Sequence, residues 1–281
     1  MHVKYLMITI AAATVTACGG GGDSGSLSSL VSQPTNPTPA PTPTPTPTPT
    51  PSQVPQSAAE GIWIGTTNTN RTVNGVVLND GSYYLFYSPA GQPGQIGGVI
   101  QGSGTAKGGS YASGDGRDFN LAANTLTALS LSSSYQEQKT LAGMVTYVAA
   151  GGPTETLTTV YSSMYEAKPA LSALAGQYSV QIGVLGTVGT ATLAVGSDGS
   201  LVGSSASIST STSNSCGISG TLAPRDRGNA YDATIVFDAN CAYPTQTTKG
   251  AAYFDASSKR LYVVTVNNER TRAAAIVGTR P

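Results

Sequence analysis

Histidine is almost absent from this sequence, because the only one is His2, at the start of the chain. The rest of the chain therefore cannot form a Ser-His-Asp or Cys-His arrangement, or bind zinc or iron through histidine. The motifs Gly-x-Ser-x-Gly, Ser-x-x-Lys and Gly-x-x-x-x-Gly-Lys are also missing, although the chain has 34 glycines. We expect no catalytic residues, no metal ligands, no cofactor and no enzymatic activity.

Charged side chains are scarce, at 10% of residues, with 14 basic and 14 acidic groups in balance. Tight binding to nucleic acid needs clustered lysine and arginine, so we expect no nucleic-acid partner. Residues 58–167 nevertheless carry a net charge of −3 and residues 168–281 a net charge of +3. Most of the positive excess comes from Arg225, Arg227, Lys259, Arg260, Arg270, Arg272 and Arg280. These groups form either a cationic face for a polyanion or acidic protein, or solvated loop charge and contacts between the two halves; we favour the second interpretation.

The sequence also has no apolar run long enough for a bilayer-spanning helix of ~20 residues. The apolar run near the start covers only Tyr5–Ala13. It follows Lys4 and precedes small residues, which is the pattern of a secretory signal peptide over residues 1–17. The sequence Val15-Thr16-Ala17-Cys18 resembles the lipobox of bacterial lipoproteins. The resemblance implies lipid attachment at Cys18, with acyl chains such as palmitate, and Gly19 implies sorting to the outer membrane. Two or more acyl chains give stable anchoring.

Only two cysteines remain once Cys18 is assigned to the lipid anchor. Cys216 and Cys241 lie in what we expect to be an exported domain, where a cysteine pair forms a disulfide. The bond would close a loop of about 26 residues and contribute roughly 3.5 kcal/mol by the chain-entropy estimate. The alternative is a pair of buried free thiols.

Residues 18–57 have the composition of a linker, first rich in glycine and serine and then dominated by Pro-Thr repeats. Proline fixes φ and removes the amide donor, so neither helix nor sheet is expected there. The segment Pro37–Pro51 alone would extend on the order of 45 Å as polyproline II. We interpret residues 18–57 as a disordered, lipid-anchored stalk that holds the rest of the chain off the membrane.

Beyond the stalk, short runs alternate between apolar and polar residues. Leu129 and Leu131 alternate with serines, and the segment Tyr231–Phe237 alternates in the same way. A period of two residues is typical of antiparallel sheet with one buried face. We predict an all-β fold of two tandem eight-stranded up-and-down antiparallel β-barrels, in domains 58–167 and 168–281. Their strands run from Gly61 to Tyr165 and from Gly176 to Thr279, and Pro169–Ala175 forms a turn or two of helix.

The two halves share a series of matching features that indicates an internal duplication. Each opens with a proline, then a glycine and an aromatic residue, in Gly61-Ile62-Trp63 and Gly176-Gln177-Tyr178. Each then reaches an Asp-Gly-Ser turn, at Asp80-Gly81-Ser82 and Asp198-Gly199-Ser200, and continues into a glycine-punctuated strand. Asp-Gly supplies the positive φ angles of tight hairpins.

The sequence Gly61-Ile62-Trp63 resembles the Gly-x-Trp that opens the first strand of lipocalin-like barrels. The resemblance implies that Trp63 plugs one end of the first barrel. It also implies that Tyr178 does so in the second barrel, with Arg270 or Arg272 from the last strand as its partner. A tryptophan near a strand start is otherwise an ordinary core residue, and that interpretation remains open.

One acidic segment, GDGRDFN, places Asp115, Asp118 and Asn120 close together. Calcium loops need oxygen ligands at alternate positions and a distal glutamate, and this spacing does not match. We predict an ordinary polar turn. No pair of carboxylates is placed by the sequence for glycoside hydrolysis.

These features together favour a binding protein of the cell envelope that acts as a receptor, adhesin or scaffold. The architecture resembles Gram-negative surface lipoproteins with small barrels, such as the transferrin-binding-protein B-like and complement-regulator-binding families, although their motifs are not matched. The expected partners are outer-membrane lipid through Cys18 and an unknown protein or glycan, at the cell surface or the periplasmic face. An inhibitor of an exported enzyme and a carrier of a small apolar ligand are the alternatives. We expect side chains to fill the barrels, which disfavours the carrier.

Overall fold

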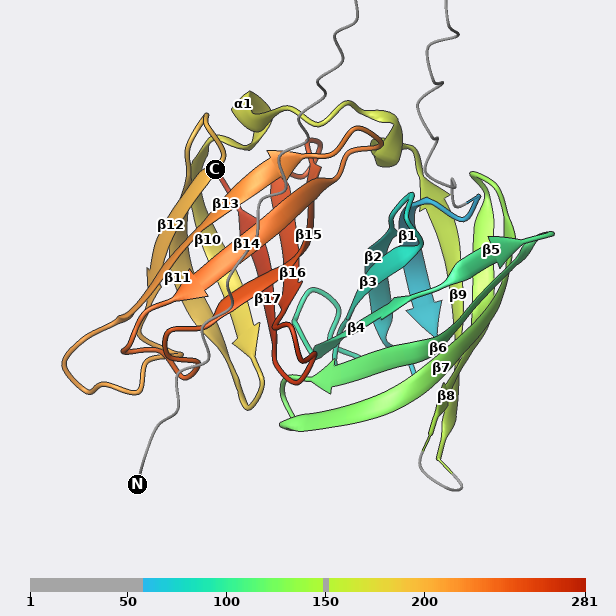
Figure 1. Cartoon of the computed structure of the whole chain (residues 1–281), viewed down its shortest axis with the longest axis horizontal. Coiled ribbons are helices and arrows are strands. Elements are labelled where there is room, and N and C mark those ends of the chain that lie inside the picture. Colours follow the sequence, from blue (N-terminus) through green and yellow to red (C-terminus); the bar gives the residue numbers. More distant parts are fainter. Residues whose placement is uncertain (1–57, 149–151) are drawn as a thin grey trace, which may run out of the picture. The chain divides into compact units, whose positions relative to one another are not determined.

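A computed structural model describes residues 58–148 and 152–281 of the chain and confirms the all-β prediction (Figure 1). Two closed antiparallel barrels account for nearly all of the regular structure. The expectations for the signal peptide, for Cys18 and for the stalk lie outside the described residues.

The first barrel is an up-and-down sheet of eight strands that closes where β1 pairs with β9 and β4 pairs with β6. Its strands are β1 (Gly61–Thr67), β2 (Thr72–Val77), β3 (Ser82–Tyr87), β4 (Gly98–Ser103), β5 (Thr105–Lys107), β6 (Ser110–Asn120), β7 (Thr125–Gln136), β8 (Thr140–Tyr147) and β9 (Thr154–Ser162). The short β5 follows β4 after Gly104 and pairs with the other end of β6, so the two together act as one barrel strand. The predicted count of eight is therefore confirmed.

The second barrel follows the same up-and-down order, with β10 pairing with both β11 and β17 to close the ring. Its strands are β10 (Gly176–Val184), β11 (Thr187–Val195), β12 (Ser200–Ser205), β13 (Cys216–Pro224), β14 (Tyr231–Phe237), β15 (Thr247–Asp255), β16 (Arg260–Val266) and β17 (Ala273–Thr279). A 3₁₀ turn, η1 (Ser163–Glu166), and a single helical turn, α1 (Leu171–Leu174), connect the barrels. Neither of these helical segments is long and apolar enough to cross a membrane.

Alternation along the strands explains why both interiors are packed. On β14, the residues Tyr231, Ala233, Ile235 and Phe237 are buried, and those between them are more exposed. The first interior is filled by large side chains such as Trp63 and by aliphatic residues, and the second by a similar mixture that includes both cysteines. Each barrel therefore has its own hydrophobic core. The buried apolar surface stabilises the folded state by about 25 cal/mol per Å².

Three strands of the second barrel do not alternate, because they are buried on both faces. The segments Ala251–Phe254 of β15, Leu261–Thr265 of β16 and Ala273–Ile276 of β17 are buried at every position. Continuous apolar runs of this kind occur in sheets covered on both sides. The inward side chains face the barrel core, and the outward ones belong to a separate apolar cluster that includes strands of the first barrel.

The two Asp-Gly-Ser turns have the same geometry in both barrels, as the proposed duplication requires. In Asp80-Gly81-Ser82 and in Asp198-Gly199-Ser200, the central glycine has a φ of +84°. The serine amide donates to the aspartate Oδ1 at 2.9 Å in each turn. In each, the carbonyl of the central glycine accepts an amide from the following strand region. Matching local geometry at matching positions supports an origin from one repeated unit.

The prediction of a turn at GDGRDFN is wrong, since the whole segment belongs to β6. The pairing of β6 with β7 shifts its register between Ser113 and Gly116, which marks a β-bulge. The bulge directs Asp115 outward, whereas Asp118 lies inside the barrel with 6% of its surface exposed. The glycines and acidic residues of this segment suggest a turn in the sequence, but in the structure they form a strand with a β-bulge.

Candidate functional site: the seam between the barrels

The outward faces of β1–β4 and β6 pack against those of β15–β17, and we call this contact the seam. Its apolar members include Ile62, Val76, Phe86, Val99, Phe119, Ala251, Tyr253, Tyr262, Val264, Ala273 and Ala275. Phe86 meets Tyr253 and Tyr262 edge to face, with ring centroids 6.4 Å and 5.6 Å apart. The two tyrosines stack on each other at 4.7 Å. The seam is therefore a third hydrophobic core, which belongs to neither barrel alone.

Arginines of the second barrel surround this core and pair with acids of the first. Arg225 forms an ion pair with Asp80 at 2.9 Å and also bonds Asp232 of its own barrel. Arg270 forms an ion pair with Asp115 at 3.0 Å and donates to the Gln101 side chain at 2.7 Å. The opposite net charges of the two halves thus meet in contacts between them, as the favoured interpretation of the charge pattern expected.

A third pair joins Arg227 to Glu60, and its Nε–Oε2 distance is 3.2 Å. The arginines also lower the pKa values of two carboxyl groups at the seam, Asp80 and Asp115. Burial alone would raise the pKa of Asp80, but hydrogen bonds from Ser82 and the charge of Arg225 hold the pKa below its usual value. The pKa of Asp115 is lowered against the same effect of burial by Ser103, Ser113 and Arg270. Both carboxylates therefore stay ionised at neutral pH, where they can pair with the arginines.

The two proposed plug residues occupy equivalent positions and make equivalent bonds. Trp63 Nε1 donates to the Ala59 carbonyl at 3.0 Å, and the Tyr178 hydroxyl donates to the Leu174 carbonyl at 2.7 Å. In each case the aromatic residue bonds back to the residue four positions earlier, and it is at most 2% exposed. Both rings therefore fasten the chain segment that enters each barrel.

The structure does not bring the predicted arginines onto Tyr178. Arg270 lies at the seam, and the guanidinium of Arg272 lies 4.6 Å from the centre of the Tyr243 ring. Arg280 is the arginine near the plug, since its guanidinium donates to the Ala175 carbonyl at 2.6 Å. Its positive charge also opposes the effect of burial on the pKa of Tyr178.

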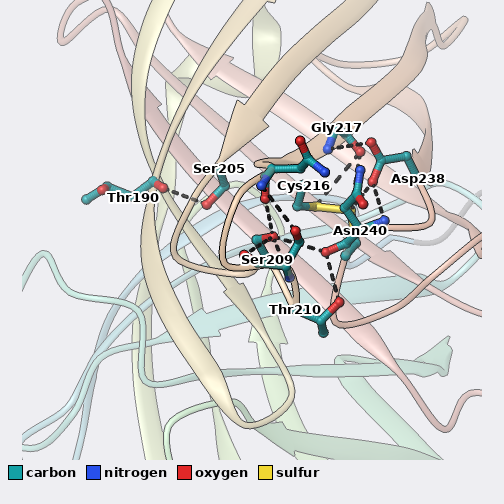
Figure 2. Close-up of a disulfide and its surroundings, with 11 residues drawn as sticks. Thr190, Ser205, Ser209, Thr210, Cys216, Gly217, Asp238 and Asn240 are labelled. Atoms are coloured by element: carbon teal, nitrogen blue, oxygen red, sulfur yellow. Dashed lines mark hydrogen bonds between the residues drawn. A yellow bond between two sulfur atoms is a disulfide. The ribbon is translucent and has the colours of Figure 1, made fainter.

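Cys216 and Cys241 form the expected disulfide, and both are buried (Figure 2). Asp238 lies beside the bond and accepts amide hydrogens from Gly217 and Asn240, both at 2.9 Å. The side chains of Cys216, Asp238 and Cys241 form a group whose donor atoms could approach one metal ion. Because the sulfurs bond to each other, they are not available as thiolate ligands. The disulfide ties the start of β13 to the segment between β14 and β15.

A polar cleft of about 660 Å³ opens where the barrels and their connection meet. It is lined by charged residues of both signs, among them Glu60, Glu137, Glu166, Lys168, Asp226 and Arg227. Glu166 accepts hydrogen bonds from Tyr161 and Gln138, and burial together with the Glu166 bond raises the pKa of Tyr161. Tyr165 also lines the cleft, and its buried hydroxyl has no hydrogen-bond partner among the residues that the structure describes. Mixed charges and an unsatisfied hydroxyl suit a polar ligand rather than an apolar one.

Sequence reasoning missed a buried cluster inside the first barrel. Asp118 accepts hydrogen bonds from the Tyr87 and Tyr147 hydroxyls at 2.7 Å and 2.8 Å. Burial raises the pKa of Asp118, while the two hydroxyls and Arg71 oppose the shift. The sequence signal was the period of two in β6, which puts Asp118 on the same face as Gly116.

Comparisons with known proteins give no family. No protein-family description matches the chain, and no curated protein matches it. Two solved structures show a distant likeness. A protein of unknown function of the DUF3598 family, from Nostoc punctiforme, has 11% identity and a TM-score of 0.27, over 80% of this chain and 97% of its own. A Bacteroides fragilis protein with a provisional outer-membrane assignment has 13% identity and a TM-score of 0.23, over 79% of this chain and 96% of its own. At these scores we take neither fold nor function from them.

Proposed function

We propose that this chain is a lipoprotein of the bacterial outer membrane that binds a protein or glycan partner through the outside of its two barrels. In this proposal the signal peptide is residues 1–17, Cys18 carries the lipid, and residues 18–57 hold domains 58–167 and 168–281 off the membrane. The role is that of a receptor, adhesin or scaffold, and it involves no catalysis.

One observation supports this location of binding: the hollows inside the first barrel are far smaller than the hollows beside the seam. Two cavities within the first barrel measure about 20 Å³ and 10 Å³. Each is about as large as a single water molecule needs. Two openings beside the seam measure about 660 Å³ and 430 Å³. Ligand sites usually occupy 300–1,000 Å³, so the seam offers space that the first barrel's interior lacks.

The lipid anchor has its own test, which does not depend on the fold. Replacing Cys18 with serine removes the only thiol that the lipobox resemblance assigns to acylation. We expect the wild-type chain in the detergent phase after phase partitioning, labelled by radioactive palmitate, and Cys18→Ser in the aqueous phase without label. Equal partitioning and labelling of the two proteins would refute lipid anchoring.

The binding role is tested at the polar cleft with the full chain in detergent. Lys168→Glu and Glu137→Lys reverse two exposed cleft charges that form no ion pair within residues 58–148 and 152–281. We expect these variants to lose ligands that the wild type retains from envelope and host glycan and protein fractions. Lys107→Glu, on the exposed β5, is the matched control and should retain them. If the cleft variants retain the same ligands as the wild type, the cleft is not the binding site.

An inhibitor of an exported enzyme is a second candidate, because one loop is fastened in a way that suits a rigid contact. The segment between β12 and β13 is held by the disulfide at its end and by Ser209, whose hydroxyl donates to the Asn214 carbonyl at 2.6 Å (Figure 2). Fixing a loop in its bound conformation lowers the entropic cost of binding. A screen against exported hydrolases, with loop residues Thr212 and Ser213 replaced by bulky arginine, would test this role.

A further inference from the structure

A second groove beside the seam contains an arginine for which the structure shows no partner. Two adjoining hollows of about 430 Å³ and 180 Å³ share Gly94, Arg260 and Val277 in their linings. Residues of β1, β2 and β3 and the loop between β3 and β4 line one side, and the outward faces of β10, β11, β16 and β17 form the other. The groove thus combines surface from both barrels.

Arg260 differs from the arginines of the seam. Its Nε is buried without a hydrogen-bond partner, and among the described residues its guanidinium forms no ion pair. Its cross-strand neighbour Asp255 does not serve it, because that carboxylate accepts hydrogen bonds from Ser257 and Ser258. A buried donor without a partner costs free energy that an incoming acceptor restores. The planar fork of arginine matches the two oxygens of a carboxylate.

The surroundings of Arg260 supply a second kind of recognition. Strand pairing places Ser179, Thr279 and Arg260 in one row across β10, β17 and β16. Thr190 of β11 also lines the groove. The hydroxyls of Ser179, Thr190 and Thr279 make no hydrogen bond within the described part of the chain, and each can donate or accept. The next row places Val277 between Gln181 and Tyr262, which adds an apolar and aromatic surface.

We infer that this groove binds an acidic saccharide, with its carboxylate on Arg260 and its ring hydroxyls on the row of serine and threonine side chains. A uronic acid combines the three chemical elements that the groove offers: a planar anion, several hydroxyls and an apolar ring face. The inference rests on the proposed binding function and names its ligand class. The site is distinct from the polar cleft at the connection between the barrels, because the two share no lining residue.

Three small probes separate the two kinds of recognition, each titrated into the full chain in detergent by calorimetry. Glucuronate has both carboxylate and ring, glucose has the ring alone, and acetate has the carboxylate alone. We expect glucuronate to bind at least about tenfold more tightly than either of the others, since each missing set of hydrogen bonds removes about that much affinity. Equal binding of glucuronate and glucose overturns the role of Arg260, and equal binding of glucuronate and acetate overturns the saccharide.

Variants then assign the effect to the groove. Arg260→Ala should abolish the preference for glucuronate over glucose, and Arg260→Lys should recover only part of it, since lysine lacks the planar fork. Arg260→Ala breaks no side-chain hydrogen bond or ion pair among the described residues, so its unfolding temperature should lie close to that of the wild type, which shows that the variant is folded. Arg117→Ala removes an exposed arginine of the first barrel and should retain full binding. A preference that survives in Arg260→Ala overturns the inference.

The proposed binding function can be judged separately. If glucuronate does not bind while cleft variants still lose other ligands, only the acidic-saccharide inference fails. If neither groove nor cleft variants alter the binding of any ligand, the binding function fails with it.

Discussion

At the scale of single residues, Asp118 has an effect on stability opposite to that of the seam carboxylates. Burial raises its pKa, whereas Asp80 and Asp115 have lowered pKa values because they accept hydrogen bonds and face arginines. A carboxyl group with a raised folded pKa binds its proton more tightly in the folded protein than in the unfolded chain. Its contribution to the free energy of unfolding is then largest at acid pH.

We predict that this contribution is lost as the pH rises from about 3.9, the usual aspartate value, through the higher folded pKa of Asp118. Asp118→Asn removes the titration, and its amide can still hydrogen-bond the Tyr87 and Tyr147 hydroxyls. Unfolding in urea at several pH values from 3 to 8 should show the wild type losing stability relative to Asp118→Asn as the pH rises. The effects of the seam carboxylates cancel in this difference. A stability of the wild type relative to Asp118→Asn that stays constant or increases as the pH rises would contradict the raised pKa.

At the scale of elements, the two Asp-Gly-Ser turns offer a direct comparison of the repeats. A Cβ added at Gly81 would overlap the Gly104 carbonyl oxygen, and one at Gly199 would overlap the Leu222 carbonyl oxygen. Gly94 has a similar φ of +86°, but a Cβ there would meet nothing within 4 Å. The three glycines therefore separate backbone strain from steric overlap.

We predict that Gly94→Ala costs about 1 kcal/mol, the price of a left-handed conformation for alanine. Gly81→Ala and Gly199→Ala should each cost about 3 kcal/mol, because overlap adds about 1–3 kcal/mol to that strain. Urea unfolding of the three variants measures these costs. Unequal losses in the free energy of unfolding at Gly81 and Gly199 would show that the two turns do not contribute equally to the stability of their barrels.

The same scale shows what could be predicted from the sequence. Strands such as Tyr231–Phe237 were predictable, because alternation is a local property that any reader of the sequence sees. The bulge of β6 was not, because only its pairing with β4 and β7 distinguishes GDGRDFN from a turn. The choice of Arg280 over Arg270 or Arg272 near Tyr178 depended on the end of β17 at which each arginine lies, since Arg270 and Arg272 precede the strand and Arg280 follows it, and composition does not reveal this.

At the scale of the whole molecule, the main feature absent from the sequence-based prediction is the apolar core of the seam. Its signal was present in the unbroken apolar runs Ala251–Phe254, Leu261–Val264 and Ala273–Ile276, which exceed what a barrel with a wet exterior needs. The surface that those runs pack against belongs to strands far away in the sequence, so the runs themselves do not reveal it. The candidate binding surfaces depend on it, because the groove at Arg260 takes its lining from both barrels.

A buried seam should make the two barrels unfold together, and the single tryptophan makes this testable. Trp63 lies in the first barrel, so its fluorescence reports that barrel alone, whereas far-ultraviolet circular dichroism reports both. We predict coincident urea transitions for the wild type, as expected of one cooperative unit. Val264→Asp places a charge on a fully buried position of the seam, where an unpaired charge is strongly destabilising.

Because each barrel keeps its own core, we expect Val264→Asp to separate the two transitions rather than to abolish folding, with fluorescence and dichroism midpoints that no longer agree. Val202→Asp, the same substitution at a position 62% exposed on β12, is the control and should leave the transitions coincident. Coincident transitions in Val264→Asp at a lower midpoint would mean that contacts other than the apolar seam couple the barrels. The arginine pairs would then be the next candidates, with Arg225→Ala as the first variant to measure, since Arg225 binds Asp80 across the seam and Asp232 within its own barrel.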